Sequence, residues 1–308
     1  MWSYILSRLL EAAVTIWGVI TIVFFSLRLT GDPVLLLVPM GTPPEQIEQL
    51  RHALGFDRPL LVQYFSFWSR VMRGDFGDSL RFGESSLPLV IERLPATAQL
   101  ALTAMVVAIV LGGVAGAVAA VRPGSVFELV AMTGALIGQA TPVFWLGIML
   151  VLIFAAELRW LPSGGRGGPS HLVLPVFTLA LFSSASIARL LRSSLLEVRG
   201  QDYVRTARAK GLPERTVFFG HQLKGALIPV VTVVGVQTGR LLGGAVITET
   251  IFSWPGVGRL IVQAIENRDF PLVQASATVL AVTIVGVNLI VDLTYAMLDP
   301  RIRLGRSN

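Results

Sequence analysis

The sequence predicts an all-α integral membrane protein with six membrane-spanning helices. The 308-residue chain is 53% hydrophobic and 14% charged, with a mean hydropathy of +0.70. A soluble domain carries about 25% charged residues, so the composition favours a membrane protein. Six mainly apolar stretches are long enough to cross a bilayer, which takes about 20 residues. Arginine-rich segments flank several of these stretches, as expected for loops on the cytoplasmic side of a membrane.

The six stretches divide the chain into four parts. An N-terminal transmembrane helix occupies residues 1–30, an outer region 31–96, a transmembrane core 97–297 and a C-terminal tail 298–308. The predicted spans are residues 9–29, 99–121, 131–156, 172–191, 227–249 and 273–297. The first apolar run is too long for a signal peptide and no cleavage site follows it, so it is expected to remain as a helix.

Two of the predicted spans contain residues with a structural meaning. Pro142 follows Thr141 inside the third span, where a proline frees a backbone carbonyl and kinks the helix. Gly112 and Gly116 lie four residues apart in the second span, on one helix face. Such a pair allows a neighbouring helix to approach closely in a membrane.

The distribution of charge predicts the orientation in the membrane. Basic residues concentrate in the segment 189–225 and in the tail, whereas the outer region 31–96 holds more acidic than basic residues. The positive-inside rule then places both termini in the cytoplasm. The outer region and the loops 157–171 and 250–272 are expected on the opposite side.

The outer region is predicted to contain two or three short amphipathic helices. Thr42-Pro43-Pro44-Glu45 is typical of a helix start, and apolar residues recur at helical spacing from Ile47 to Val71. Gly74-Asp75-Phe76-Gly77 is typical of a turn. Two interpretations stay open here: these helices pack against the membrane helices, or they form a landing surface for an outside partner.

The composition also limits the chemistry. The chain has no cysteine, its three histidines lie far apart, and neither lysine belongs to a phosphate-binding GK[ST] motif. We therefore expect no catalytic residue, no metal site and no bound cofactor. The net charge of +6 is better explained by topology and anionic lipid headgroups than by nucleic acid.

Polar residues within the spans are candidates for a translocation path, because polar groups in lipid are costly and usually functional. The candidates are Gln139, Gln237, Arg240 and Asn288. Hydrogen bonding between helices is the alternative role for the three amides.

The segment Gln201–Pro229 lies between two long apolar runs and is basic, with helix-forming character. A short helix is predicted from Tyr203 to Gly211, and a second from Pro213 to about Leu223. Ala207 and Gly211 lie four residues apart, which predicts a bare face that another backbone can approach. The sequence thus predicts a structured cytoplasmic loop, 192–226, that fits a cleft in a partner protein.

This loop resembles the EAA loop of permease subunits of ATP-binding-cassette importers. In the run YVRTARAKGL, Arg205, Thr206 and Ala207 stand at the E-A-A positions and Gly211 at the loop glycine. Two of the three letters differ, and the spacing from Gly211 to Pro229 is longer than in the general motif. Both departures are typical of the dipeptide, oligopeptide, glutathione and nickel importers.

Further motifs along the chain resemble the same branch, in the same order. They are Arg8-Leu9-Leu10, Gly31-Asp32-Pro33, the run 54–60, Gly74-Asp75-Phe76-Gly77-Asp78-Ser79, the run 252–258 and Asp299-Pro300-Arg301-Ile302-Arg303. The long outer region after the first span resembles the first of the two permease subunits in these systems.

The resemblance implies a type I importer permease fold and a set of partners. These are a homologous second permease, two cytoplasmic ATPase subunits that bind ATP and magnesium, and an extracytoplasmic substrate-binding protein, all at a bacterial or archaeal cytoplasmic membrane. The residues implied in coupling to the ATPase are Arg205, Thr206, Ala207, Gly211, Leu212, Pro213 and Glu214.

Several alternatives remain at this point. Within the family, a peptide is the expected substrate, and glutathione, a nickel chelate or an oligosaccharide are the others. A stand-alone ion-coupled carrier or channel is a second class, although few acidic residues lie near mid-membrane. An exporter permease is a third, although exporters commonly carry a fused ATPase.

Overall fold

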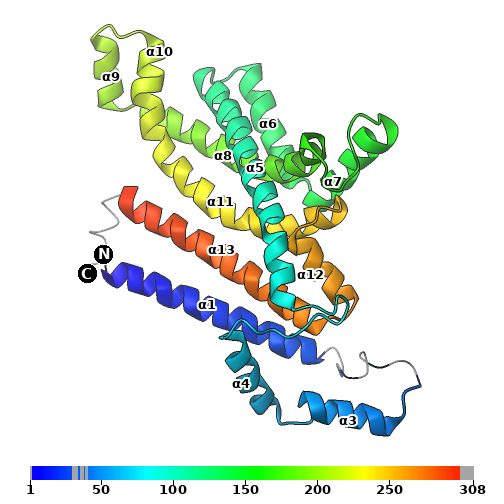
Figure 1. The fold of residues 1–308 in the computed structure, drawn as a ribbon. Helices are drawn as coiled ribbons and strands as arrows, with labels where there is room; N and C mark the ends of the chain where they lie inside the picture. Colours follow the sequence, from blue (N-terminus) through cyan, green and yellow to red (C-terminus); the bar gives the residue numbers. More distant parts are fainter. Residues whose placement is uncertain (1, 30–33, 35–37, 39–40, 299–308) are drawn as a thin grey trace. The chain divides into compact units, whose positions relative to one another are not determined.

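The computed structural model describes residues 2–29, 34, 38 and 41–298, and it is built from helices (Figure 1). Within this described part no β-strand occurs, and Asp78 and Ser85 form an isolated bridge. The motifs Gly31-Asp32-Pro33 and Asp299–Arg303, and the tail beyond residue 298, lie outside the described residues. The elements are α1 (Trp2–Leu29), α3 (Pro44–Leu54), α4 (Leu60–Val71), α5 (Ser86–Val121), α6 (Val126–Ala140), α7 (Val143–Leu150), η1 (Val151–Glu157), α8 (Pro169–Arg199), α9 (Asp202–Ala209), α10 (Glu214–Thr216), η2 (Val217–Gln222), α11 (Leu223–Ile251), α12 (Val257–Glu266) and α13 (Phe270–Leu298).

The chain divides into two compact units. Unit 1 comprises Met1–Ala96 and Pro255–Leu289, and unit 2 comprises Thr97–Trp254 and Ile290–Asn308. Helices α5 and α13 each contribute residues to both units. The two units are described separately below.

Described helices cover the place of each of the six predicted spans. Five helices are long and apolar enough to cross a membrane, or six if the bent α6–α7 pair counts as one span. Several begin earlier than their apolar cores suggest: α5 begins at Ser86 and α8 at Pro169. Hydropathy marks only the part of a helix that suits lipid, so the polar first turns were missed.

The third predicted span, 131–156, is broken rather than kinked. Helix α6 ends at Ala140, α7 begins at Val143, and the two directions differ by 104°. Thr141 adopts an extended backbone with φ −75° and ψ 123°. The ring of Pro142 disfavours the helical conformation for the residue before it, so the helix stops there. Beyond α7 the chain continues as the π-helical segment η1.

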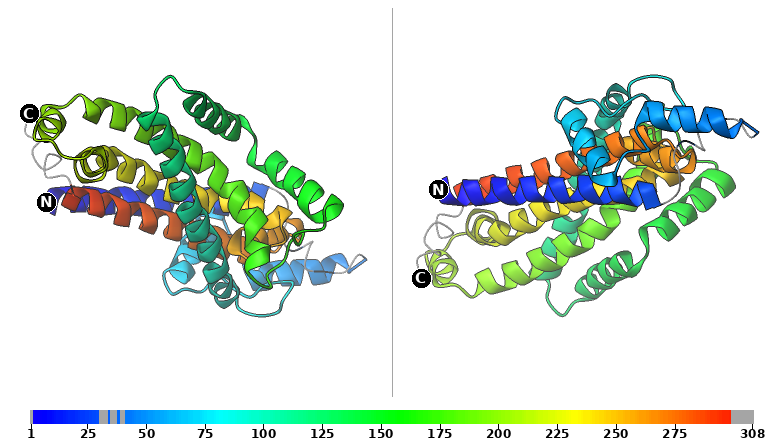
Figure 2. Two further views of the ribbon diagram at one scale, coloured as in Figure 1. Left: turned by 90° about the horizontal axis from the view of Figure 1, so that it is seen from above. Right: turned by 90° about the horizontal axis from the view of Figure 1, so that it is seen from below.

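The core of unit 2 is built around α8, which packs against α6, α7 and α11. Figure 2 shows α8 running alongside α11. Ile187 and Leu191 of α8 are buried together with Ala226 and Val230 of α11 and with Ala108 of α5. The arrangement makes a cluster of small and branched apolar side chains.

The α5–α8 contact depends on glycine. A Cβ atom at Gly112 would lie 2.5 Å from the carbonyl oxygen of Ser184, and one at Gly116 would lie 2.5 Å from that of Ala188. Because only glycine fits at such a distance, the predicted close approach at Gly112 and Gly116 is confirmed.

In unit 1, α4 packs on the end of α1 through aromatic rings. The ring centroids of Phe24 and Tyr64 lie 5.3 Å apart and those of Phe24 and Phe67 lie 5.2 Å apart. The hydroxyl groups of Thr21 and Tyr64 are 2.8 Å apart and share a hydrogen bond. The packing interpretation of the outer helices therefore holds for this face of α4.

Asp269 fixes the loop after α4 to the start of α13. Its side chain is 1% exposed and accepts hydrogen bonds from the Ser79 hydroxyl, from the Arg81 backbone N–H at 3.3 Å and from the Leu272 backbone N–H at 3.2 Å. The last of these caps α13 in the manner of an N-cap aspartate. One buried carboxylate thus joins residues that lie 190 positions apart in the sequence.

Candidate functional site

The candidate coupling loop connects α8 to α11 and folds as two helical segments. After Gly200 the chain forms α9, turns through residues 210–213 and enters α10, as Figure 1 shows beside the start of α11. The second segment was predicted to end near Leu223. Instead, α10, η2 and α11 form one helix from Glu214 to Ile251, because no residue after Pro213 stops it.

The turn at the end of α9 requires glycine. The Leu212 N–H donates to the carbonyl oxygen of Ala207 at 3.4 Å, and the Gly211 N–H donates to that of Arg208 at 2.9 Å. These two bonds form a Schellman motif, in which the residue at the Gly211 position adopts left-handed backbone geometry. Gly211 has φ +76°, and the space around an added Cβ is open.

The loop has a small hydrophobic core of its own. Val204, Ala207 and Val217 are buried, and Val198 at the end of α8 packs against them. Ala207 is 5% exposed, so the predicted bare face applies to Gly211 and not to Ala207. The small size of Ala207 serves packing between α9 and η2.

An ion pair joins the two segments across the turn. Arg208 Nε and Nη2 lie 2.7 and 3.2 Å from the two carboxylate oxygens of Glu214, which is a bidentate arrangement. The hydrogen bonds from Arg208 hold the pKa of the Glu214 carboxyl below its usual range, and those to Glu214 raise the pKa of Arg208. Both groups lie in the loop, ahead of the predicted span 227–249.

The other implied coupling residues face outward. Arg205, whose side chain is 74% exposed, lies on the surface with Thr206, Leu212 and Pro213. Two exposed aromatic residues of the loop, Tyr203 and Phe219, were not predicted as site residues. The sequence feature that could have identified them is an aromatic residue within a segment that is otherwise rich in charged residues. Exposed apolar side chains of this kind suit a protein partner.

A second feature of unit 2 is a hollow of about 530 Å³ between α8 and α11. It is lined by Ser186, Arg189 and Leu190 of α8 and by Val233, Val236, Gln237 and Arg240 of α11. We name this feature the polar hollow. Gln237 is 3% exposed, and its Oε1 has no hydrogen-bond donor among the described residues.

The polar hollow brings together two of the four predicted path residues, Gln237 and Arg240. Gln139 lies on α6 and is not among the residues that line it, and Asn288 lies in the other unit, where it is exposed. Ser186 and Arg189 are lining residues that the sequence interpretation missed. Arg189 lies near the end of its span, so it was counted as a cytoplasmic charge only.

The described residues give no sign of a metal centre. No group of three or more His, Cys, Asp or Glu side chains within the described ranges lies close enough to hold a metal ion.

Comparison with known proteins adds two family matches and several relatives. Residues 108–304 match the family described as binding-protein-dependent transport system inner membrane component, and residues 1–101 match its N-terminal counterpart. The dipeptide transport system permease protein DppB of Alkalihalophilus pseudofirmus is 41% identical over 98% of this chain and 100% of its own length. The corresponding protein of Escherichia coli K12 is 38% identical over 98% and 99%. The glutathione transport system permease protein GsiC of the same strain is 40% identical over 98% and 99%.

Two solved structures share the fold. The inward-facing MetNI methionine transporter superimposes with a TM-score of 0.55 and 17% identity, covering 68% of this chain and 96% of its own. An amino acid transporter crystallised with histidines gives a TM-score of 0.53 and 20% identity, covering 68% and 94%.

Proposed function

The chain belongs to the family of binding-protein-dependent transport system inner membrane components, and we propose that it is the peptide-translocating permease subunit of an importer driven by ATP. As a multi-pass permease of this family it works in a complex with a second permease, an ATPase and a substrate-binding protein. In this proposal the ATPase subunits bind and hydrolyse ATP, and this chain supplies one half of the membrane path. Both termini lie in the cytoplasm, in accordance with the charge distribution.

The substrate class follows from the relatives. Full-length relatives named as dipeptide or di/tripeptide transport permeases, at 38–41% identity, support a di- or oligopeptide as the substrate. Glutathione is the second candidate because the GsiC relative is equally similar. Glutathione is itself a short peptide, so both candidates agree on the chemistry of the solute.

The observation that carries the coupling role is the geometry of the loop between α8 and α11. Its own core, its Schellman turn and the Arg208–Glu214 pair make it a folded body rather than a connector. It continues without interruption into α11, which lines the polar hollow. A partner that moves the loop would therefore move the wall of that hollow.

The polar hollow is proposed as part of the path. Arg240→Leu should reduce transport while leaving assembly intact, because the side chain is exposed and lines the hollow. The matched control is Ile247→Leu, which changes an exposed apolar side chain of α11 that does not line the hollow and removes no charge. Loss of assembly in Arg240→Leu would instead give this arginine a structural role.

The first experiment is affinity purification of the tagged chain from its native membrane in mild detergent, with mass spectrometry of the co-purifying proteins. The proposal expects a second permease and ATPases with phosphate-binding loops. Reconstituted vesicles should then accumulate a dipeptide, or glutathione, only with ATP and the binding protein present. Uptake by this chain alone, without ATP, would replace the importer with a stand-alone carrier or channel.

A further inference from the structure

Unit 1 contains a pocket of about 550 Å³ that is open to solvent on one side and differs in character from the polar hollow of unit 2. Its walls come from the end of α1, the turn between α3 and α4, α4 itself, the loop at residues 76–80 and the first turns of α13. We name it the arginine pocket, because Arg28, Arg58 and Arg70 line it. A volume of this size is that of a small-ligand site.

A hydrogen-bonded frame holds one side of the arginine pocket. Arg28 Nε donates to Gln63 Oε1 at 3.1 Å, and the Arg28 guanidinium lies 3.4 Å from the centre of the Phe24 ring. Gln63 Nε2 donates to the backbone carbonyl oxygens of Phe56 and Arg58, at 3.1 and 2.8 Å. Gln63 therefore links α1 to the turn between α3 and α4 and positions the surrounding cations.

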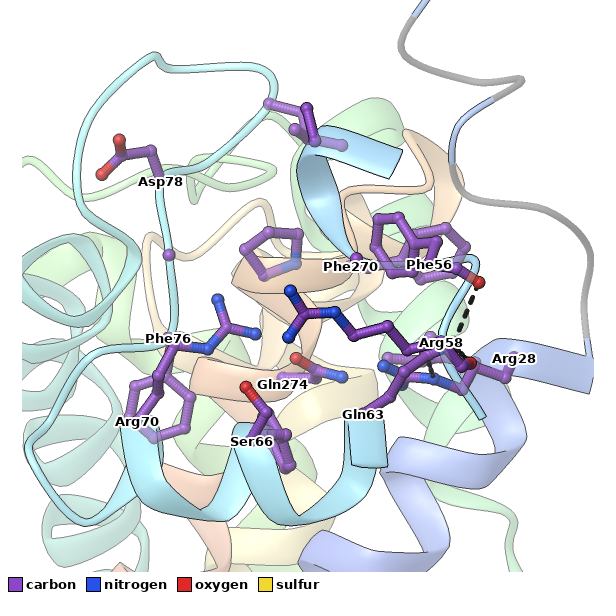
Figure 3. A pocket seen from close by; sticks show the side chains of 17 residues that line it. Arg28, Phe56, Arg58, Gln63, Ser66, Arg70, Phe76, Asp78, Phe270 and Gln274 are labelled. Carbon is purple, nitrogen blue, oxygen red and sulfur yellow. Dashed lines mark hydrogen bonds between the residues drawn. The ribbon is translucent and has the colours of Figure 1, made fainter. Parts of the chain in front are cut away.

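The other two cations meet in the middle of the pocket. Figure 3 shows the guanidinium groups of Arg58 and Arg70 turned toward one another, with Gln274 between and below them. Gly55, with φ +71°, forms the turn that carries Arg58, and an added Cβ there would lie 3.4 Å from Arg58 Nε.

No acid of the described chain neutralises these three guanidinium groups through an ion pair. The carboxylate of Asp57 pairs with His52 at 2.7 Å, and that of Asp75 accepts the Gly77 N–H at 2.9 Å. Asp78 lines the pocket, but Figure 3 shows its carboxylate directed away from the arginines. Like charges that converge are unfavourable unless an opposite charge joins them, and an anion bound in the pocket would supply that charge.

Gln274 adds a neutral hydrogen-bonding group to the arginine pocket. Its side chain is buried, at 9% exposure, and Figure 3 shows its amide directed into the arginine pocket. The amide therefore reaches the open space of the pocket and can donate a hydrogen bond to an acceptor of a bound ligand.

From this geometry we propose that the arginine pocket binds the carboxylate of a short peptide. This inference rests on the proposed transport of peptides. The planar forks of Arg58 and Arg70 match a carboxylate in bidentate fashion, and Gln274 supplies one further donor. The rings of Phe56 and Phe270 provide apolar walls for the neighbouring side chain of the peptide.

A site that binds the terminal carboxylate can accept peptides with different side chains. Every unmodified peptide carries a terminal carboxylate whatever its side chains. A phosphate headgroup of an anionic lipid offers similar charge, but the aromatic rings of Phe56 and Phe270 beside the arginines suit the side chain of a compact solute better than a polar headgroup. The experiment below separates these two sources.

The test uses the purified permease complex without its binding protein, in nanodiscs of phosphatidylcholine. Binding of L-alanyl-L-alanine and of its C-terminal amide is measured by saturation-transfer NMR. The free acid should bind at least about tenfold more tightly than the amide, since a charged hydrogen-bond pair is lost. Arg70→Gln and the double variant Arg58→Gln with Arg70→Gln should each weaken binding of the acid by about tenfold or more.

The matched control is Arg73→Gln, which removes an exposed arginine one turn further along that does not line the pocket. It should leave binding unchanged. Equal binding of acid and amide, or unchanged binding in Arg70→Gln, would overturn the proposal. The proposal would also be overturned if phosphatidylglycerol displaced the dipeptide and its retention depended on Arg58 and Arg70. The pocket would then be assigned to a lipid headgroup.

The outcome is separable from that of the proposed function. A complex that imports peptide with ATP but whose dipeptide binding ignores Arg58 and Arg70 contradicts only the arginine pocket. A chain that co-purifies with no ATPase contradicts the transport proposal, whatever the pocket binds.

Discussion

Substitution of Gly211 separates the two roles that this residue can play, as a turn residue and as a contact for a partner. Gly211 has φ +76° in the Schellman turn, and a residue with a Cβ atom is destabilised by about 1–2 kcal/mol in this left-handed geometry. Gly211→Ala gains back about 0.4–1 kcal/mol from a less flexible unfolded chain. Because nothing lies within 4 Å of the added Cβ, no clash contributes. The net destabilisation is about 1 kcal/mol, which opens the turn about fivefold more often.

Gly211→Trp carries the same backbone strain as Gly211→Ala but adds a large ring to an exposed position. If the loop docks in a partner cleft, tryptophan should abolish co-purification of the ATPase subunits, and alanine should leave most of it. Gly211→Asn is the control for strain, since asparagine tolerates left-handed geometry better than alanine. The measurements are the yield of co-purified ATPase and the peptide transported per ATP hydrolysed.

Equal losses in the alanine and tryptophan variants would show that Gly211 acts through the turn alone. Normal transport in the tryptophan variant would refute docking at this position. Hydrogen exchange at the loop amides provides the internal check, because both variants should open the turn to a similar degree.

Three further substitutions test the packing on which the site depends. Gly112→Ala should destabilise the protein by about 1–3 kcal/mol, because its Cβ would lie 2.5 Å from a carbonyl oxygen of α8, whereas Gly113→Ala, with open space around it, should leave the thermal midpoint nearly unchanged. Glu249→Ala removes the acceptor of the 2.6 Å hydrogen bond that the Thr97 hydroxyl donates in a fully buried site, and should lower the stability of the protein by about 1–3 kcal/mol. Glu249→Gln retains an acceptor oxygen and should lower it less. Equal thermal midpoints of the two variants would contradict this role of the hydrogen bond. Asp269→Ala should cost about 1–2 kcal/mol through loss of the α13 cap, with faster amide exchange in the loop 79–81, and unchanged exchange there would contradict the joining role of this carboxylate.

The sequence was sufficient for the features that depend on composition and local pattern. Apolar length located the membrane helices, because the bilayer fixes how many apolar residues a helix needs. The glycine at position 211 predicted the end of α9, since the Schellman turn is a local motif. Gly112 and Gly116 predicted a close helix contact for the same reason: their spacing alone defines a face.

Features that depend on direction could not be predicted. The pattern placed Ala207 on a bare face with Gly211, but Val204 and Val217 bury it inside the loop. A proline at position 142 predicts a disturbance of the helix, yet not the 104° change of direction, which depends on what α7 packs against. The arginine pocket was invisible because Arg28, Arg58 and Arg70 come from three separate segments.

The continuity of the helix from Glu214 to Ile251 connects the loop to the polar hollow by the simplest physical route. Gln237 and Arg240 belong to the same helix as the second segment of the loop. Two points along this helix can bend, the π-helical segment η2, Val217–Gln222, and Pro229, and both lie between the first turn and the hollow. A displacement of the loop would therefore reach Gln237 and Arg240 through these two points. If coupling uses this helix, stabilising ordinary α-helical bonding within η2 should change the ATP consumed per peptide transported, without changing which subunits assemble.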